Sequence, residues 1–199
     1  MAKLRLTKNE QKKQKDSLKM YKRYLPTLML KKQQLQMEIR GVDLRFNELQ
    51  LEKSKLNESY NKWVAIFGEE GVFTPDILKI SKLVTKEGNI AGVAIPIFEN
   101  VEFEIAHYDL IEKPLWLDIA VENMEKALRL DLELQILEEQ QRLLKKELQT
   151  TSQRVNLFEK VKIPETKSNI KKIAVYLGDQ DTAAVVRGKI SKKGMEKAS

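Results

Sequence analysis

The sequence has no cysteine and only one histidine, His107, among its 199 residues. Disulfides and thiolate metal sites are therefore excluded, and a lone histidine assembles neither a Ser-His-Asp triad nor a metal cluster. No glycine-rich loop precedes a Lys-Ser or Lys-Thr pair, so a Walker-type phosphate cradle is missing. We therefore predict a protein that is not an enzyme and that binds no metal or cofactor.

Glycine, proline and long apolar runs are also scarce. The chain has 8 Gly and 5 Pro, whereas charged residues make up 33% of it, a mixture typical of long helices exposed to water. The longest apolar run, residues 90–98, is far shorter than the ~20 residues of a membrane helix. The N-terminal residues contain no apolar segment of the secretory type. We expect a cytoplasmic protein without direct membrane insertion.

Positive charge is concentrated at both ends of the chain. The formal net charge is +7, but residues 1–40 carry +9, residues 160–199 carry +6 and residues 41–159 carry −8. If the two ends meet in a basic tip, their repulsion calls for an acidic surface or dissolved anions around them; the alternative is a merely solvated basic face. The candidate residues of this basic tip are Arg5, Lys8, Lys12, Lys13, Arg187, Lys189, Lys192 and Lys193.

Apolar residues recur with a 3-4 spacing along two segments of about fifty residues each, as the seam of a left-handed coiled coil requires. The first segment carries Leu18, Tyr21, Leu25, Leu28, Lys32, Leu35, Ile39, Val42, Phe46, Leu49, Lys53, Leu56, Tyr60, Trp63 and Phe67. The second carries Ala127, Leu130, Leu134, Leu137, Gln141, Leu144, Leu148, Thr151, Val155 and Phe158. Lys32 and Lys53 are the exceptions in the first segment.

Two such helices in one chain are most simply paired antiparallel, with paired residue numbers that sum to about 180. Leu18 then lies near Lys162, and Thr7 lies near Ile173. The predicted fold class is mostly α, a long antiparallel two-helix coiled coil with a small β-hairpin module between the helices. The expected segments are an N-terminal shaft helix (1–67), the hairpin module (68–112), a C-terminal shaft helix (113–178) that begins near Pro114 and stops at Gly178, and a basic tail (179–199).

The middle module has the pattern of β-structure. Two β-rich runs flank residues 86–89, where Gly88 and Asn89 are expected to supply the positive φ angles of a hairpin turn. Residues 101–105 alternate apolar and acidic side chains, which indicates a further strand, and Pro96 indicates an edge or a strand end. Since isolated hairpins are marginal in water, we expect this one to pack on the helices or on a neighbour.

Two further features of the helices point to a partner and to bending. An apolar row recurs every seven residues on the side of the first helix away from the seam: Leu30, Met37, Leu44 and Leu51. A two-stranded coil should be polar there, so this outer row indicates a third helix or a second protein, unless the helix packs on its own middle module. Pro26 and Pro164 interrupt the helical patterns and predict kinks, or else junctions between straight helices.

Three stretches resemble the D subunit of V-type and A-type rotary ATPases. The C-terminal motif of that family is matched by Arg154, Val155, Asn156, Glu159, Ile163 and Pro164. The N-terminal Thr-Lys opening is similar at Thr7 and Lys8. The middle element of the family is similar at Asn89, Ile90, Gly92, Val93 and Pro96. These stretches lie at both ends and at the centre, so the resemblance covers nearly the whole chain.

The resemblance implies a non-catalytic rotor shaft, present in one copy per complex and peripheral to the membrane. In that family the paired terminal helices enter a hexamer of alternating A and B catalytic subunits, and the other end joins the F subunit and a socket subunit on the membrane ring. ATP hydrolysis turns the shaft and pumps H⁺ or Na⁺, and the reverse drives synthesis. The basic tip would face acidic turns of the hexamer cavity, the outer row would contact the F subunit or the cavity wall, and the acidic hairpin module would lie near the F subunit or the foot.

Two other classes fit parts of the pattern. The basic ends permit a nucleic-acid-binding coiled coil, but aromatic stacking residues are missing from the tails beyond Tyr176, so we expect no nucleic-acid partner. A coiled-coil scaffold or prefoldin-like chaperone has the same two helices and hairpin, yet it leaves the motif at residues 154–164 unexplained. Co-purification with two nucleotide-binding subunits would favour the rotor.

Overall fold

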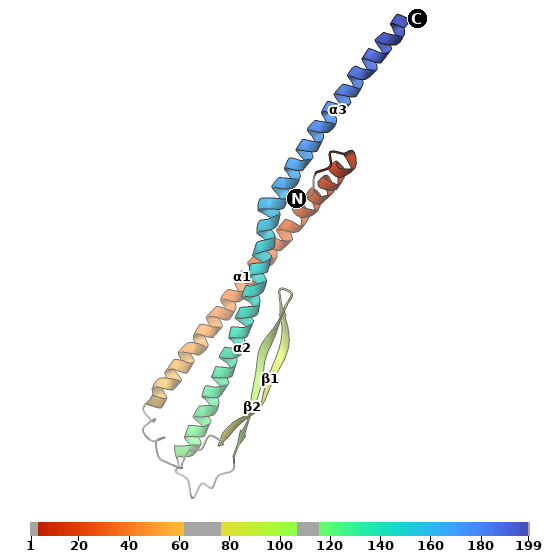
Figure 1. Cartoon of the computed structure of the whole chain (residues 1–199). Helices are drawn as coiled ribbons and strands as arrows, with labels where there is room; N and C mark the ends of the chain where they lie inside the picture. The colour runs from red at the N-terminus through yellow and green to blue at the C-terminus, as the bar shows by residue number, and fades with distance from the viewer. Residues whose placement is uncertain (1–3, 62–76, 107–115, 199) are drawn as a thin grey trace. The chain divides into compact units, whose positions relative to one another are not determined.

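The computed structural model describes residues 4–61, 77–106 and 116–198 (Figure 1). Along the chain it contains α1 (Lys8–Asn61), β1 (Leu78–Ile90), β2 (Val93–Ile105), α2 (Trp116–Asn156), the π-helical segment η1 (Leu157–Lys162) and α3 (Ile163–Ala198). Long helices at both ends and a two-stranded antiparallel hairpin between them confirm the predicted fold class. Trp63, Phe67, His107 and Pro114 lie outside the described residues.

The chain forms two compact units, which are described in turn. The first comprises Met1–Lys32 and Thr150–Ser199, and the second comprises Gln33–Gln149. Within the described ranges, no helix combines the length and the apolar character that crossing a bilayer requires.

The second unit is built around the seam between α1 and α2. Leu35, Leu49 and Leu144 are at most 1% exposed and belong to one apolar cluster. Arg45 Nη2 lies 3.2 Å from Glu133 Oε1, and Lys53 Nζ lies 2.6 Å from Asp131 Oδ1. Numbers rise along α1 as they fall along α2 and sum to about 180, so the antiparallel register predicted for the coil is confirmed in this unit.

The hairpin lies along the helices of this second unit, as Figure 1 shows. Ile95 is 3% exposed and joins the apolar cluster of the seam, and Val101 is also 3% exposed. Gln140 Nε2 on α2 donates a hydrogen bond of 2.5 Å to the carbonyl oxygen of Pro96. The expectation that the hairpin packs on the helices is therefore confirmed. Pro96 is tolerated because both strands of a two-stranded sheet are edge strands.

Two details of the predicted hairpin were wrong. The turn lies at Ala91 and Gly92, which have φ angles of 51° and 80°, and not at residues 86–89. Asn89 contributes its side-chain oxygen, which accepts a hydrogen bond of 2.9 Å from the backbone N–H of Gly92. Residues 101–105 are the second half of β2 and not a third strand, because β2 continues through Pro96 and pairs with β1 along its whole length.

In the first unit, the start of α1 lies against the end of α2, η1 and the start of α3. The rings of Tyr21 and Phe158 are 5.2 Å apart, and these two positions also belong to the predicted register. Val155 and Ile173 are at most 4% exposed. Thr7 precedes α1 as its N-cap, since its Oγ1 accepts a hydrogen bond of 3.3 Å from the backbone N–H of Glu10.

The last helix is longer than predicted. α3 passes through Gly178 without a break and continues to Ala198, so the expected helix stop at Gly178 was wrong. A glycine ends a helix only if the following backbone leaves the helical conformation, and here the backbone stays helical beyond Gly178. The basic residues of the predicted tail therefore lie on a helix.

Candidate functional site

The structure places all eight residues of the basic tip in the first unit and exposes all of them. Arg5 precedes α1, and Lys8, Lys12 and Lys13 lie in its first turns. The antiparallel register of Tyr21 and Phe158, extended to Lys8, corresponds to the part of α3 near residue 172. Arg187 lies about fifteen residues further along α3, roughly 22 Å away at the rise of a helix. The basic tip therefore consists of two clusters spaced along the axis of α3, and the two chain ends do not meet at one point.

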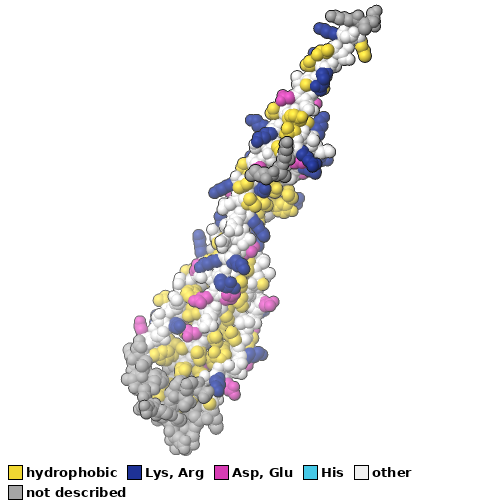
Figure 2. All heavy atoms as spheres, in the orientation of Figure 1, with side chains coloured by type: hydrophobic (Ala, Val, Ile, Leu, Met, Phe, Trp, Pro, Cys, Tyr) yellow, Lys and Arg dark blue, Asp and Glu magenta, His cyan; other side chains and the backbone are white. Residues whose placement is uncertain are grey.

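The end of α3 continues past the first turn of α1 (Figure 1). Figure 2 shows dark-blue Lys and Arg side chains interspersed with yellow apolar ones along this part of the helix. The exposed apolar residues are Val185, Val186, Ile190 and Met195. A surface that binds this end must accept cationic and apolar side chains together.

The outer row is exposed as predicted. Leu30, Met37, Leu44 and Leu51 are between 56% and 66% exposed, far above what the seam leucines show. The hairpin does not cover the row, so the reading in which the first helix packs its outer row on its own middle module is wrong for the described residues. Gly41 lies one turn from both Met37 and Leu44, and a Cβ atom there would meet nothing within 4 Å.

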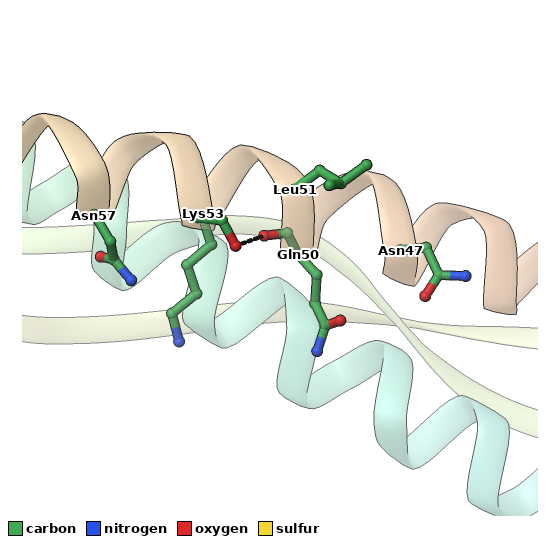
Figure 3. Close-up of a pocket in the computed structure, with 6 residues that line it drawn as sticks. Asn47, Gln50, Leu51, Lys53 and Asn57 are labelled. Atoms are coloured by element: carbon green, nitrogen blue, oxygen red, sulfur yellow. Dashed lines mark hydrogen bonds between the residues drawn. The ribbon is translucent and has the colours of Figure 1, made fainter.

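Figure 3 shows that the side chains near Leu51 lie on two different faces of α1. Leu51 points away from α2, whereas Lys53 and Gln50 point toward it. Ser54 Oγ donates a hydrogen bond of 2.9 Å to the carbonyl oxygen of Gln50, and these residues line a shallow surface depression together with Asn47 and Asn57. The outer row therefore adjoins a polar, amide-rich surface.

Pro164 directly follows a change in helical hydrogen bonding. The backbone N–H of Ile163 donates to the carbonyl oxygen of Phe158, a step of five residues that defines the π-helical segment η1. A proline lacks an N–H and its ring crowds the carbonyl four residues earlier, so a wider turn before Pro164 relieves that contact. Pro26, in contrast, lies inside α1 without any interruption of the helix.

Polar contacts across the second unit were not predicted, although Gln141 was noted as a seam position. Its Nε2 donates to Asp43 Oδ1 on α1. The Tyr60 hydroxyl donates to the carbonyl oxygen of Asn123, and burial raises the pKa of Tyr60. The hydrogen bond with Glu133 raises the pKa of Arg45, although partial burial opposes that effect. These contacts fix the alignment of the helices and do not form a catalytic arrangement.

No group of three or more His, Cys, Asp or Glu side chains that could hold a metal ion occurs in the part of the chain that the structure describes. The charged pairs are spread along helix surfaces instead. An example is Glu139, whose pKa is lowered by its hydrogen bonds with Arg142 three residues later. The candidate functional surfaces are therefore the basic tip, the end of α3 and the outer row.

These surfaces lie on long helices that pair antiparallel in each of the two units. The family model for the D subunit of ATP synthase matches residues 10–193 of the chain. A V-type ATP synthase D subunit from Borreliella burgdorferi is 53% identical over 197 residues, covering 99% of this chain and 97% of that protein. Proteins of the same name from Chlamydia caviae and Chlamydia trachomatis serovar L2 are 32% and 33% identical, each over 97% of this chain and 94% and 96% of their own lengths.

The chain therefore belongs to the family of ATP synthase D subunits. The resemblance noted in the C-terminal motif is confirmed over nearly the full length.

Proposed function

We propose that this protein is the central rotor shaft of a V-type rotary ATPase or ATP synthase. It acts in one copy per complex, is itself non-catalytic, and couples ATP hydrolysis or synthesis in the A and B subunits to rotation of the membrane ring and to H⁺ or Na⁺ transport. The observation that carries this proposal is the antiparallel seam, found in register in each unit, on a chain of the D-subunit family.

The seam supports torque transmission. A helix resists bending and twisting best when an apolar seam and cross-helix polar contacts hold it to a second helix. Leu35, Leu49 and Leu144 supply the apolar part, and the Lys53–Asp131 ion pair adds a specific contact. A shaft of this construction transmits rotation to whatever is bound along it.

The basic tip supports a rotating contact inside the hexamer. The exposed Lys and Arg side chains of α1 and α3 would face acidic turns of the cavity wall. Charge attraction decays slowly with distance, so it holds the shaft while its neighbours change during a turn. Close interlocking of side chains would oppose rotation because each step would break many contacts.

The outer row supports a contact with the F subunit or with the cavity wall. Three exposed residues of the second unit, Met37, Leu44 and Leu51, follow one face of α1. Gly41 leaves an open notch between them, although alanine would favour the helix more. A partner helix approaching closely at this notch would explain the glycine. The socket subunit and a position near the membrane remain part of the same proposal.

The test is reconstitution. The chain is co-expressed with candidate A, B and F subunits, and ATPase turnover, ion transport and co-purification are measured with and without it. We expect the A and B subunits to retain the chain and ion transport to depend on it. Failure of the A and B subunits to retain the chain, together with unchanged transport in its absence, would refute the proposal.

A further inference from the structure

The side chains at the end of α3 pack little against the rest of the described chain. Between Gly178 and Met195 every side chain is exposed except Ala183, which is half-buried. The side-chain hydrogen bonds of this stretch stay within α3: Thr182 Oγ1 donates to the carbonyl oxygen of Gly178 at 3.0 Å, and Gln180 Nε2 donates to the Tyr176 hydroxyl at 2.8 Å. In the described chain, this part of the helix therefore depends on its own backbone hydrogen bonds.

Its residues are also poorly suited to an isolated helix. Gly178, Gly188 and Gly194 lie in it, and a Cβ atom on any of the three would meet nothing within 4 Å. No close approach within the described chain explains these glycines. Each lowers the ratio of helix to coil about fivefold relative to alanine. The hydroxyl of Thr182 competes for a backbone carbonyl of the helix, which weakens it further.

The preceding helix nevertheless provides a template. Ile173 is fully buried, so α3 is held up to about this point. A helix that grows from an existing turn avoids the cost of nucleation, and its length is then set by the propensity of each added residue. A stretch with three glycines and little packing is expected to lose its helical turns from the free end inward.

The exposed side chains indicate what would complete this helix. Val185, Val186 and Ile190 are 58%, 50% and 66% exposed, and Arg187 and Lys189 lie among them. Apolar side chains favour a surface that removes them from water, and the cations favour carboxylates. A protein surface that is apolar and acidic provides both.

We propose that residues 178–195 are a conditional helix, only partly formed in the free chain and completed when they dock on an apolar, carboxylate-rich protein surface. Ordering on binding lowers affinity per contact but lets a segment adapt to a surface whose shape changes. The identification of that surface with the cavity of the A and B hexamer rests on the proposed function; the partial order of the free segment does not.

The first test is amide hydrogen exchange on the free full-length chain. We expect residues 180–195 to exchange at least tenfold faster than the amides around Val155 and Ile173, which lie in the packed part of the unit. Equal protection of the two regions would overturn the inference, because the end of α3 would then be stable without a partner.

A set of matched variants tests the cause. The triple variant Gly178→Ala, Gly188→Ala and Gly194→Ala keeps every charge, and we expect it to raise the helix-to-coil ratio by about fivefold per site. The control Ala183→Gly with Ala184→Gly lies in the same stretch and should act in the opposite direction. If the triple variant leaves exchange of residues 180–195 unchanged, helix propensity does not set the order of this segment and the inference fails.

The final test repeats the exchange measurement on the chain bound to the A and B subunits. We expect protection of residues 180–195 to rise at least tenfold and the triple alanine variant to bind more tightly than the glycine control.

If residues 180–195 stay unprotected in the bound chain, the inference is overturned, although the rotor function remains intact. Protection by duplex DNA instead would contradict a protein surface. Failure of the A and B proteins to bind the chain, with rapid exchange in the free chain, would count against the proposed function alone.

Discussion

Lys53 Nζ lies 2.6 Å from Asp131 Oδ1 across the seam of the second unit, and each side chain is 39% exposed. Lys53 occupies a seam position where the apolar pattern is interrupted, so the ion pair explains the exception. A shift of α1 along α2 would move the ammonium group away from the Asp131 carboxylate. The pair therefore favours one alignment of the helices more than it adds to stability.

A double-mutant cycle with Lys53→Ala and Asp131→Ala measures this pair. Because both side chains are partly exposed, we expect a coupling free energy of about 0.2–1 kcal/mol that declines with added salt. Urea unfolding of the four proteins gives the value. The pair of Lys126 and Glu122, 56% and 65% exposed on one helix, serves as the control and should couple less. A coupling that does not change with salt would argue against an ion pair.

Two leucines that are two residues apart on α1 should respond differently to truncation. Leu49 is 1% exposed and Leu51 is 62% exposed. We expect Leu49→Ala to lower the free energy of unfolding by about 2–5 kcal/mol and Leu51→Ala to change it by less than about 0.5 kcal/mol. Thermal or urea unfolding of the isolated chain checks both.

The same pair separates folding from partner binding. Under the proposed function, Leu51→Ala should weaken retention of the F subunit or of the hexamer although the chain remains stable. Equal retention by Leu51→Ala and by the unchanged protein would remove the outer row from the list of contact surfaces.

Two glycines should respond with opposite sign when replaced by alanine. Gly92 has a φ of 80°, so Gly92→Ala strains the hairpin turn and should destabilise the second unit by about 1–2 kcal/mol. Gly41 lies in α1 with open space where a Cβ would stand, so Gly41→Ala should stabilise the isolated chain by about 1 kcal/mol. Urea unfolding measures both, and a destabilising Gly41→Ala would show that the helix needs this glycine for its own packing.

We expect Tyr60 to contribute to the free energy of unfolding at neutral pH and to lose this contribution at high pH. Burial raises the pKa of Tyr60, so the folded chain keeps the phenol proton to higher pH than the unfolded chain does. The stabilising contribution of Tyr60 is therefore fully present at pH values below the ordinary pKa of tyrosine. It disappears as the pH rises through the folded-state pKa of Tyr60. In a spectrophotometric titration, Tyr60→Phe should remove the component that ionises at high pH. Tyr176→Phe, at an exposed position, is the matched control and should leave that component in place.

The sequence predicted the helices and their pairing well because burial repeats along them. Leu35 and Leu144, both predicted as seam positions, are fully buried, and the outer position Leu44 is 66% exposed. The hairpin turn was misplaced because Gly88 and Asn89 have the composition of a turn, whereas Ala91 adopts a positive φ that its residue type rarely takes. Gly88 serves packing instead: a Cβ there would lie 2.4 Å from Cδ1 of Ile97.

The candidate surfaces were predicted less completely. Charge counts identified the basic residues, but composition does not say how far along a helix they lie, and the prediction of a stop at Gly178 concealed the separation of Lys8 from Arg187. Gln140 was missed as a contact to the hairpin because a buried amide leaves no repeat in the sequence. Its role depends on the strand that the fold brings beside it.

Pro164 provides the last test, which distinguishes a kink in the helix from a junction between two straight helices. Replacing Pro164 by alanine restores an N–H and removes the ring, so the wide turn of η1 is no longer required and a regular helix becomes possible through residues 157–166. We expect the variant to unfold at higher denaturant concentration, because proline is about 3 kcal/mol less favourable than alanine inside a helix. If the wide turn at Pro164 bends the shaft and the bend matters for the proposed function, the same variant should reduce torque and the coupling of ATPase turnover to ion transport. Pro26→Ala, in a helix that shows no π-helical turn, is the matched control and should change coupling less. A Pro164→Ala protein with unchanged torque and coupling would favour the other reading, in which the proline marks a junction between two straight helices.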